Sequence, residues 1–243
     1  MIYWKNLAFI YWFKILNKLG KAENFKKNIF SSKRILEKNF KINSDFNFIQ
    51  IGANDGKSFD FLYDFVVLRK SKGLVVEPIK SYYEELEKNY ENFPEIKKIN
   101  KAIHPSEKEI IFYRIAPNAI DKYPEWVKGI ASVDPSHHKK LHINTNDIIE
   151  EIVSSESLMK LIKENFKYEI IDYFQIDTEG FDYEVLKMMD FSIINPSMIK
   201  YEFVNLNHRD NNNLSLLLRK EGYYFFNEAE DTIAIDLKKI RLF

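Results

Sequence analysis

Short β-rich runs alternate with segments of helical periodicity along most of the chain, from residue 46 to residue 226. Strands separated by helices join in parallel, and a parallel sheet needs helices on both faces. The pattern therefore predicts an α/β fold. The expected strands cover 46–51, 73–76, 96–99, 109–115, 170–176 and 198–204, and the expected helices cover 59–69, 81–92, 146–153, 157–166, 181–189 and 213–221.

The two ends of the chain depart from this alternation. Tyr223–Phe226 and Thr232–Ile235 form two β-rich runs with a short link, which predicts an antiparallel hairpin. Two helical segments, at residues 1–20 and 23–40, precede the first strand. We expect a helical extension at residues 1–44 and an α/β domain at residues 45–243.

Composition excludes several classes of function. The 243 residues carry 36 basic and 36 acidic side chains, which argues against a broad electrostatic surface for nucleic acid. The chain has no cysteine, so disulfides, thiolate nucleophiles and thiolate metal sites are excluded. A cytoplasmic location fits this composition.

The amino-terminal segment is strongly apolar and aromatic. Its longest uncharged run, Leu7–Phe13, is much shorter than the roughly 20 residues of a membrane-spanning helix. One interpretation is a helix that packs on the domain or on a second subunit. The other is an anchor in the interface of the inner membrane, with Trp4 and Trp12 at headgroup depth.

A segment with three prolines and little periodicity, residues 116–142, is too long for a plain connection. Long loops of this kind are typical of functional lids or partly disordered segments. His137, His138 and His142 lie in it, and we expect them to be exposed or to belong to a lid. Trp126 in the same segment, and Tyr113 and Tyr123, offer rings that can stack on a sugar or pack in a core.

The first strand ends in a loop suited to a nucleotide. Gly52 allows a sharp turn, and Ala53 and Gly56 allow a ligand to approach the backbone. Glu77 ends the second strand 21 residues after Gly56, where a carboxylate can accept both hydroxyls of a ribose. The order and spacing predict a ligand that contains adenosine.

Asn54 argues against a dinucleotide, because it stands where a pyrophosphate site has its second glycine. S-adenosylmethionine has no phosphate and needs no such cradle. Asn54, Asp55 and the amides of the loop can serve its amino and carboxylate groups.

These stretches resemble the FkbM family of S-adenosylmethionine-dependent methyltransferases over residues 46–226. The segment from Asp177 to Leu186 is the most specific part of the resemblance. The matching runs are 48–56, 75–78, 100–103, 176–180, 183–186 and 199–202, with Pro78 directly after Glu77.

The resemblance implies a class I, Rossmann-like methyltransferase fold with a mostly parallel seven-stranded sheet, and makes residues 45–243 the catalytic domain. Gly52–Gly56 would face the methionine end, Glu77 the ribose, and Ala102 and Ile103 the adenine. Gln50 stands where many proteins of the wider fold have an acid. Recognition of the amino group would then fall to Asp55 or to backbone carbonyls.

Methyl transfer to a hydroxyl needs a group that takes the proton. Asp177 and Glu179 follow a parallel strand beside the expected donor site, and we expect one of them to be the base. Capping of the next helix is the alternative role for both. Glu202 ends the next strand and would help bind the acceptor, and the three carboxylates can also act as ligands for Mg²⁺. His208 is an alternative base.

The leading hypothesis is a sugar O-methyltransferase that acts in polysaccharide, capsule or glycolipid modification. Arg209 would contact an anionic acceptor such as a sugar nucleotide. The alternatives are methylation of a phosphoramidate, a lipid or a small natural product, and a non-catalytic nucleotide-binding scaffold. The substrate part of the leading hypothesis rests on the resemblance.

Overall fold

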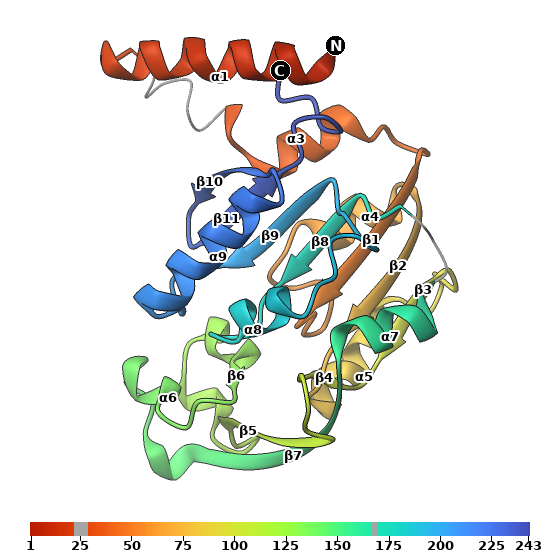
Figure 1. The fold of residues 1–243 in the computed structure, drawn as a ribbon. Helices are drawn as coiled ribbons and strands as arrows, with labels where there is room; N and C mark the ends of the chain where they lie inside the picture. Colours follow the sequence, from red (N-terminus) through yellow and green to blue (C-terminus); the bar gives the residue numbers. More distant parts are fainter. Residues whose placement is uncertain (22–28, 167–169) are drawn as a thin grey trace.

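The computed structural model describes residues 1–21, 29–166 and 170–243. Its main sheet has seven strands in the order β10-β11-β9-β8-β1-β2-β3 (Figure 1). Within it, β11 is antiparallel to both neighbours and the other pairs are parallel. Its strands are β1 (Asp45–Ile51), β2 (Lys70–Val76), β3 (Ile96–Ile99), β8 (Tyr173–Ile176), β9 (Met198–Glu202), β10 (Tyr224–Glu228) and β11 (Asp231–Ile235).

This strand order is that of a class I methyltransferase sheet, so the predicted fold and the predicted terminal hairpin are confirmed. The chain winds outward from β1 to β3 on one side and from β8 onward on the other. In such sheets a ligand binds outside the carboxyl ends of the strands where the order reverses, here between β1 and β8.

Helices cover both faces of the sheet. On one face α7 (Leu158–Asn165), α8 (Asp182–Lys187) and α9 (His208–Lys220) bury apolar side chains. The other face is covered by α1 (Ile2–Lys18), α3 (Ser32–Asn39), α4 (Leu62–Val67) and α5 (Lys80–Asn89). Both faces of the parallel strands are therefore shielded from water, as expected for the apolar β-rich runs in the sequence.

Strand β1 shows how one segment serves both cores. Phe46 and Phe48 pack with the face that carries α1, whereas Ile49 and Ile51 pack with the face that carries α7. Side chains alternate between faces along a strand. Gln50 therefore shares the face of Phe46 and Phe48, at the end of the strand that borders the ligand site.

The amino-terminal extension lies against the sheet domain. Asn6, Ile10 and Phe13 of α1 are buried, and the last residues of the chain pass beneath this helix (Figure 1). The predicted second helix is present as α3, while its first part falls outside the described residues. None of the described helices has the length and hydropathy that crossing a bilayer requires.

A second, smaller sheet has the order β4-β7-β5-β6. The predicted helix at 146–153 is wrong, because this segment forms β7. Ile148, Ile149, Ile152 and Val153 have helical spacing, but β7 pairs with β5 along seven residues. Long-range pairing thus overrides the local pattern. The strands are β4 (Ala102–Ile103), β5 (Glu109–Ile115), β6 (Ala131–Ser132) and β7 (Ile148–Glu156).

The proline-containing segment 116–142 folds into short elements beside this small sheet. They are the 3₁₀ helices η1 (Ile120–Lys122) and η2 (Glu125–Gly129), strand β6 and the short helix α6 (His137–Lys140). A third 3₁₀ helix, η3 (Thr145–Asp147), leads into β7. Helix α9 begins five residues before its predicted start, because the Asn207 side chain accepts the amide proton of Asp210 at 2.9 Å.

Candidate active site

A cavity of about 710 Å³ opens at the carboxyl ends of the central strands. Its walls come from the loop after β1, the ends of β2, β8 and β9, the small sheet, and the segment 126–141. The predicted lid therefore lines the same cavity as the loop Gly52–Gly56. A volume of this size is typical of a small-molecule site.

The loop after β1 is held in a tight turn. Gly52 has a φ of +75°, and a Cβ built on it would lie 1.7 Å from the carbonyl oxygen of Asp177. The ends of β1 and β8 therefore touch at a point where only glycine fits. Asn54 also has a positive φ, +50°, and its amide donates to Glu77 Oε2 at 2.8 Å.

Glu77 ties this loop to the end of β2. It is 4% exposed, and its other oxygen accepts the amide proton of Ile79 at 2.9 Å. Burial raises the pKa of Glu77 to about 7, although both backbone hydrogen bonds oppose this. Each carboxylate oxygen accepts one amide, so each keeps a free acceptor position for a ligand in the cavity.

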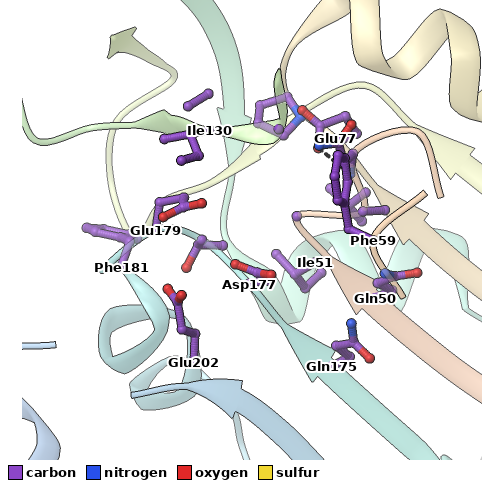
Figure 2. A pocket seen from close by; sticks show the side chains of 18 of the residues that line it. Gln50, Ile51, Phe59, Glu77, Ile130, Gln175, Asp177, Glu179, Phe181 and Glu202 are labelled. Carbon is purple, nitrogen blue, oxygen red and sulfur yellow. Dashed lines mark hydrogen bonds between the residues drawn. The ribbon is translucent and has the colours of Figure 1, made fainter. Parts of the chain in front are cut away.

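On the other side of the cavity the carboxylates of Asp177, Glu179 and Glu202 point toward one another (Figure 2). The side-chain amide of Asn205 joins two of them, donating to Glu179 at 2.9 Å and to Glu202 at 2.7 Å. Glu179 has a φ of +51°. Such a conformation is strained in a residue with a side chain and occurs often at functional sites.

Two of these carboxyl groups, those of Glu202 and Asp177, hold their protons more strongly than free ones. Burial, followed by the charge of Glu179, raises the pKa of Glu202 to about 8. Burial also raises the pKa of Asp177 well above its usual value, with Glu179, Asp182 and Glu202 adding to the effect. Asp177 lies deep among protein atoms, yet its own surface is accessible from the cavity.

Asp182 lies next to the acid cluster and holds the backbone of Glu202 and the side chain of Thr178. It is fully buried and accepts from the Thr178 hydroxyl at 2.7 Å and from the Glu202 amide at 3.1 Å. Burial raises the pKa of Asp182 to about 6. The amino end of α8 has no side-chain cap hydrogen bond, and Asp177 and Glu179, for which capping was the alternative role, line the cavity.

The segment 131–137 is bound to the acid cluster. The Ser132 hydroxyl donates to the backbone oxygen of Glu179 at 3.0 Å, and His137 Nε2 lies 3.1 Å from Glu179 Oε2. His137 and His138 are 2% and 1% exposed, which corrects the expectation that these histidines are exposed. They begin α6, and Val127 and Ile143, whose periodicity is weak in sequence, form an apolar core behind this segment.

The floor of the cavity carries two glutamines, of which the sequence analysis singled out Gln50 and missed Gln175. Gln50 and Gln175 are neighbours on β1 and β8, and both are buried. The Gln175 amide donates to Asp60. Gln50 Oε1 is buried and has no hydrogen-bond partner among the described residues. Their side-by-side position follows from the register of the two parallel strands.

The scan against family models matches residues 50–225 to the methyltransferase FkbM domain. The chain belongs to the FkbM methyltransferase family. It is therefore a methyltransferase that uses S-adenosylmethionine, and the predicted family is confirmed. The search of curated protein sequences finds no match.

Solved structures of several methyltransferases are similar to this chain at low sequence identity and with TM-scores below 0.5. An FkbM methyltransferase from Methylobacillus flagellatus KT has a TM-score of 0.48 at 11% identity, over 79% of this chain and 44% of that chain. A precorrin-6y C5,15-methyltransferase from Geobacter metallireducens GS-15 has 0.41 at 12%, over 87% and 92%. An O-methyltransferase from Bacillus cereus, in complex with SAH, has 0.41 at 11%, over 92% and 90%.

The described residues fit S-adenosylmethionine. Glu77 offers two acceptor positions to a ribose, and the unpartnered Gln50 Oε1 suits an ammonium donor. Ala102 and Ile103 line the cavity beside Pro78, as expected for an adenine edge. Asp55, predicted with backbone carbonyls as a partner of the amino group, also lines the cavity, and its Oδ1 accepts from the amides of Lys57 and Ser58.

Two predicted residues lie apart from this cavity. His208 and Arg209 are exposed in the first turn of α9 and are absent from the cavity lining. His208 Nδ1 lies 3.0 Å from the Asn212 amide on the same helix. Of the three aromatic rings considered for stacking, Trp126 lines the cavity, whereas Tyr123 donates to Asp147. Among the described residues, no group of acids and histidines is arranged to hold a metal ion.

Proposed function

We propose that this methyltransferase methylates a hydroxyl group of a sugar. The observation that carries the proposal is the cluster of Asp177, Glu179 and Glu202 in the same cavity as the loop Gly52–Gly56 and Glu77. When bound, S-adenosylmethionine supplies a methyl group on a positively charged sulfur. The residues of the chain hold this donor, orient the acceptor and take up its proton.

Donor binding is assigned to residues around the carboxyl ends of β1 and β2. Glu77 would accept the ribose hydroxyls, and Gln50 Oε1 would accept from the amino group. Ala53, Asn54, Asp55 and Gly56 border the remaining donor surface with their backbone. Leaving the buried Gln50 oxygen without a donor costs about 1–3 kcal/mol, so a ligand that pairs with it gains affinity.

Asp177 is assigned as the base. Asp177 lines the cavity, and its raised pKa gives its carboxylate a stronger affinity for the proton of an alcohol than a free carboxylate has. Glu179 is held by Asn205 and lies next to His137, so it is better placed to fix the lid and the acceptor. Glu202 shares the amide of Asn205 and would contact a second hydroxyl of the acceptor.

The charge of the cavity favours a neutral acceptor. Seven acidic side chains line it against three lysines and one histidine. When the cluster is ionised, as its base must be to take up a proton, a phosphate or carboxylate beside it would be repelled, whereas hydroxyl groups can donate to these carboxylates. Trp126 and Phe59, which are 52% and 56% exposed, offer rings at the mouth on which a sugar can stack.

The test compares Asp177→Asn, Glu179→Gln and the control Glu164→Gln, an exposed residue of α7. Methylation is followed with labelled donor and a panel of sugars and sugar nucleotides, with and without EDTA. Calorimetry with the demethylated product measures donor binding. We expect Asp177→Asn to lose turnover at least 100-fold, roughly the share of a general base, while donor affinity stays within about threefold.

Unchanged turnover in Asp177→Asn would refute the assignment of Asp177 as the base, and a loss in Glu179→Gln alone would move that role to Glu179. Turnover on a phosphoramidate, lipid or small natural product but on no sugar would move the proposal to the other acceptors. Donor binding without methylation of any acceptor would favour the scaffold alternative.

A further inference from the structure

Helix α1 carries an apolar face that no other described element covers. Trp4, Tyr11 and Leu19 are 72%, 70% and 63% exposed, and Trp12 and Ile15 are exposed beside them. Positions 4, 8, 11 and 15 lie on one side of a helix, because neighbours on a helix surface are three or four residues apart. Single exposed apolar residues are common, but a continuous aromatic strip marks a contact surface.

The opposite face of α1 fixes how this strip is presented. Asn6 is fully buried and donates to the backbone oxygens of Leu237 at 2.9 Å and Ile240 at 2.6 Å. Its own oxygen accepts the amide proton of Leu242 at 3.1 Å. Ile10 joins the main core on the same side. The aromatic strip therefore cannot turn inward without breaking these contacts.

Positive charge surrounds the strip. Residues 1–21 contain four lysines, at positions 5, 14, 18 and 21, and no acid. Further cations lie near the end of α3. Burial lowers the pKa of Lys38, and the nearby charges of Arg241, Arg34 and Lys41 lower it further. The whole chain has a formal net charge of zero, so the remainder is acidic and this end is cationic.

We propose that α1 docks the enzyme on a lipid surface that contains anionic lipids, with its aromatic strip in the interface. Trp and Tyr are enriched at the level of the headgroups, and lysines beside them extend toward the phosphates. A helix that packs one side on the protein and exposes an aromatic strip beside lysines can lie in the plane of the interface. A second copy of the chain suits the surface less well, because pairing two strips would bring eight lysines together without an acid.

The position of α1 determines how the docked protein would be oriented relative to the lipid surface. In Figure 1, α1 lies at one end of the molecule, while β5, β6 and α6, which border the cavity, lie at the other end. The cavity would then face away from the lipid. Acceptors that are soluble, or that extend from the membrane as a chain, would reach it.

The experiment sediments the full chain with vesicles of phosphatidylcholine alone or with about 30% phosphatidylglycerol. We expect binding to the anionic vesicles at least tenfold tighter than to the neutral ones, since each lysine near the surface adds to the attraction. Salt should weaken it. The variant Trp4→Ala/Trp12→Ala should lose at least tenfold in binding, whereas Trp126→Ala, an exposed tryptophan outside α1, should bind as before.

Fluorescence locates the contact. The chain has three tryptophans, so Trp126→Phe leaves only those of α1. We expect its emission to shift to the blue on anionic vesicles. Calorimetry with the demethylated donor product should give the same affinity for the α1 variant as for the wild type, which separates this proposal from the assignment of the active site.

Three results would overturn the proposal. One is absence of sedimentation with either vesicle. Another is binding without a blue shift in Trp126→Phe. The third is a dimer in light scattering that becomes a monomer in Trp4→Ala/Trp12→Ala, because a second copy would then cover the strip. Thermal melting of the variant confirms that a loss of binding is not a loss of folding.

Discussion

Replacing Gly52 with alanine tests the junction of β1 and β8 on which the donor loop depends. The added Cβ would meet the Asp177 carbonyl oxygen at 1.7 Å, whereas ordinary contacts begin at 3.4 Å, so the strand ends must separate by more than an ångström. That movement would weaken two hydrogen bonds at these strand ends. The Gly52 amide donates to the Val76 carbonyl oxygen and the Asp177 amide donates to the Ile51 carbonyl oxygen, both at 2.9 Å.

Three contributions add to the cost. A left-handed conformation costs an alanine about 1–2 kcal/mol, overpacking costs about 1–3 kcal/mol, and each weakened hydrogen bond costs about 1 kcal/mol. We expect Gly52→Ala to lower the free energy of unfolding by about 4–7 kcal/mol and to abolish detectable donor binding.

Gly222→Ala is the matched control. Gly222 has a φ of +85° with nothing within 4 Å of the added Cβ, so it carries the conformational cost without the clash. Urea unfolding measures the free energies of both variants, and calorimetry with the demethylated donor product measures binding. If Gly52→Ala is no less stable than Gly222→Ala and still binds the product, the reasoning about this junction fails.

Two further predictions concern the acids and the mouth of the cavity. A carboxyl group with a raised pKa in the folded state stabilises the fold at low pH, and this contribution is lost as the pH rises through the folded pKa. Burial raises the pKa of Asp182 to about 6, of Glu77 to about 7 and of Glu202 to about 8. In the absence of donor, the melting temperature should therefore decrease as the pH is raised from about 5 to about 8.5. Glu202→Gln should flatten the upper part of this fall, and a melting temperature independent of pH would contradict the burial argument. Trp126→Ala should raise the KM for a sugar acceptor about 5- to 20-fold through loss of a stacking face, with kcat and donor affinity nearly unchanged; an equal loss in donor affinity would place Trp126 elsewhere in the mechanism.

The residues of the proposed donor side could be brought to one cavity from sequence alone because their signals are local. Gly52 and Glu77 each end a β-rich run, and the order of parallel strands brings such ends to one edge. The same rule brought Asp177 and Glu202 to the cavity. The terminal hairpin also followed from its short link.

The remaining features depend on contacts between distant segments. β7 has a helical pattern in sequence and becomes a strand only by pairing with β5. His137 enters the site because a small core under segment 116–143 folds it back over Glu179. The pairing of Gln50 with Gln175 in the cavity could not be predicted without the register of β1 and β8, which places the two residues side by side.

The central claim is that Glu77 holds the sugar of the donor at the end of β2. Calorimetry with S-adenosylmethionine and its demethylated product tests it in the wild type, in Glu77→Gln and in the control Glu84→Gln, an exposed residue of α5. The wild type and control should bind one equivalent with equal affinity, and Glu77→Gln should bind at least about tenfold more weakly because a charge-assisted pair of hydrogen bonds is lost. Absence of heat in the wild type, or equal affinity in all three proteins, would contradict the account.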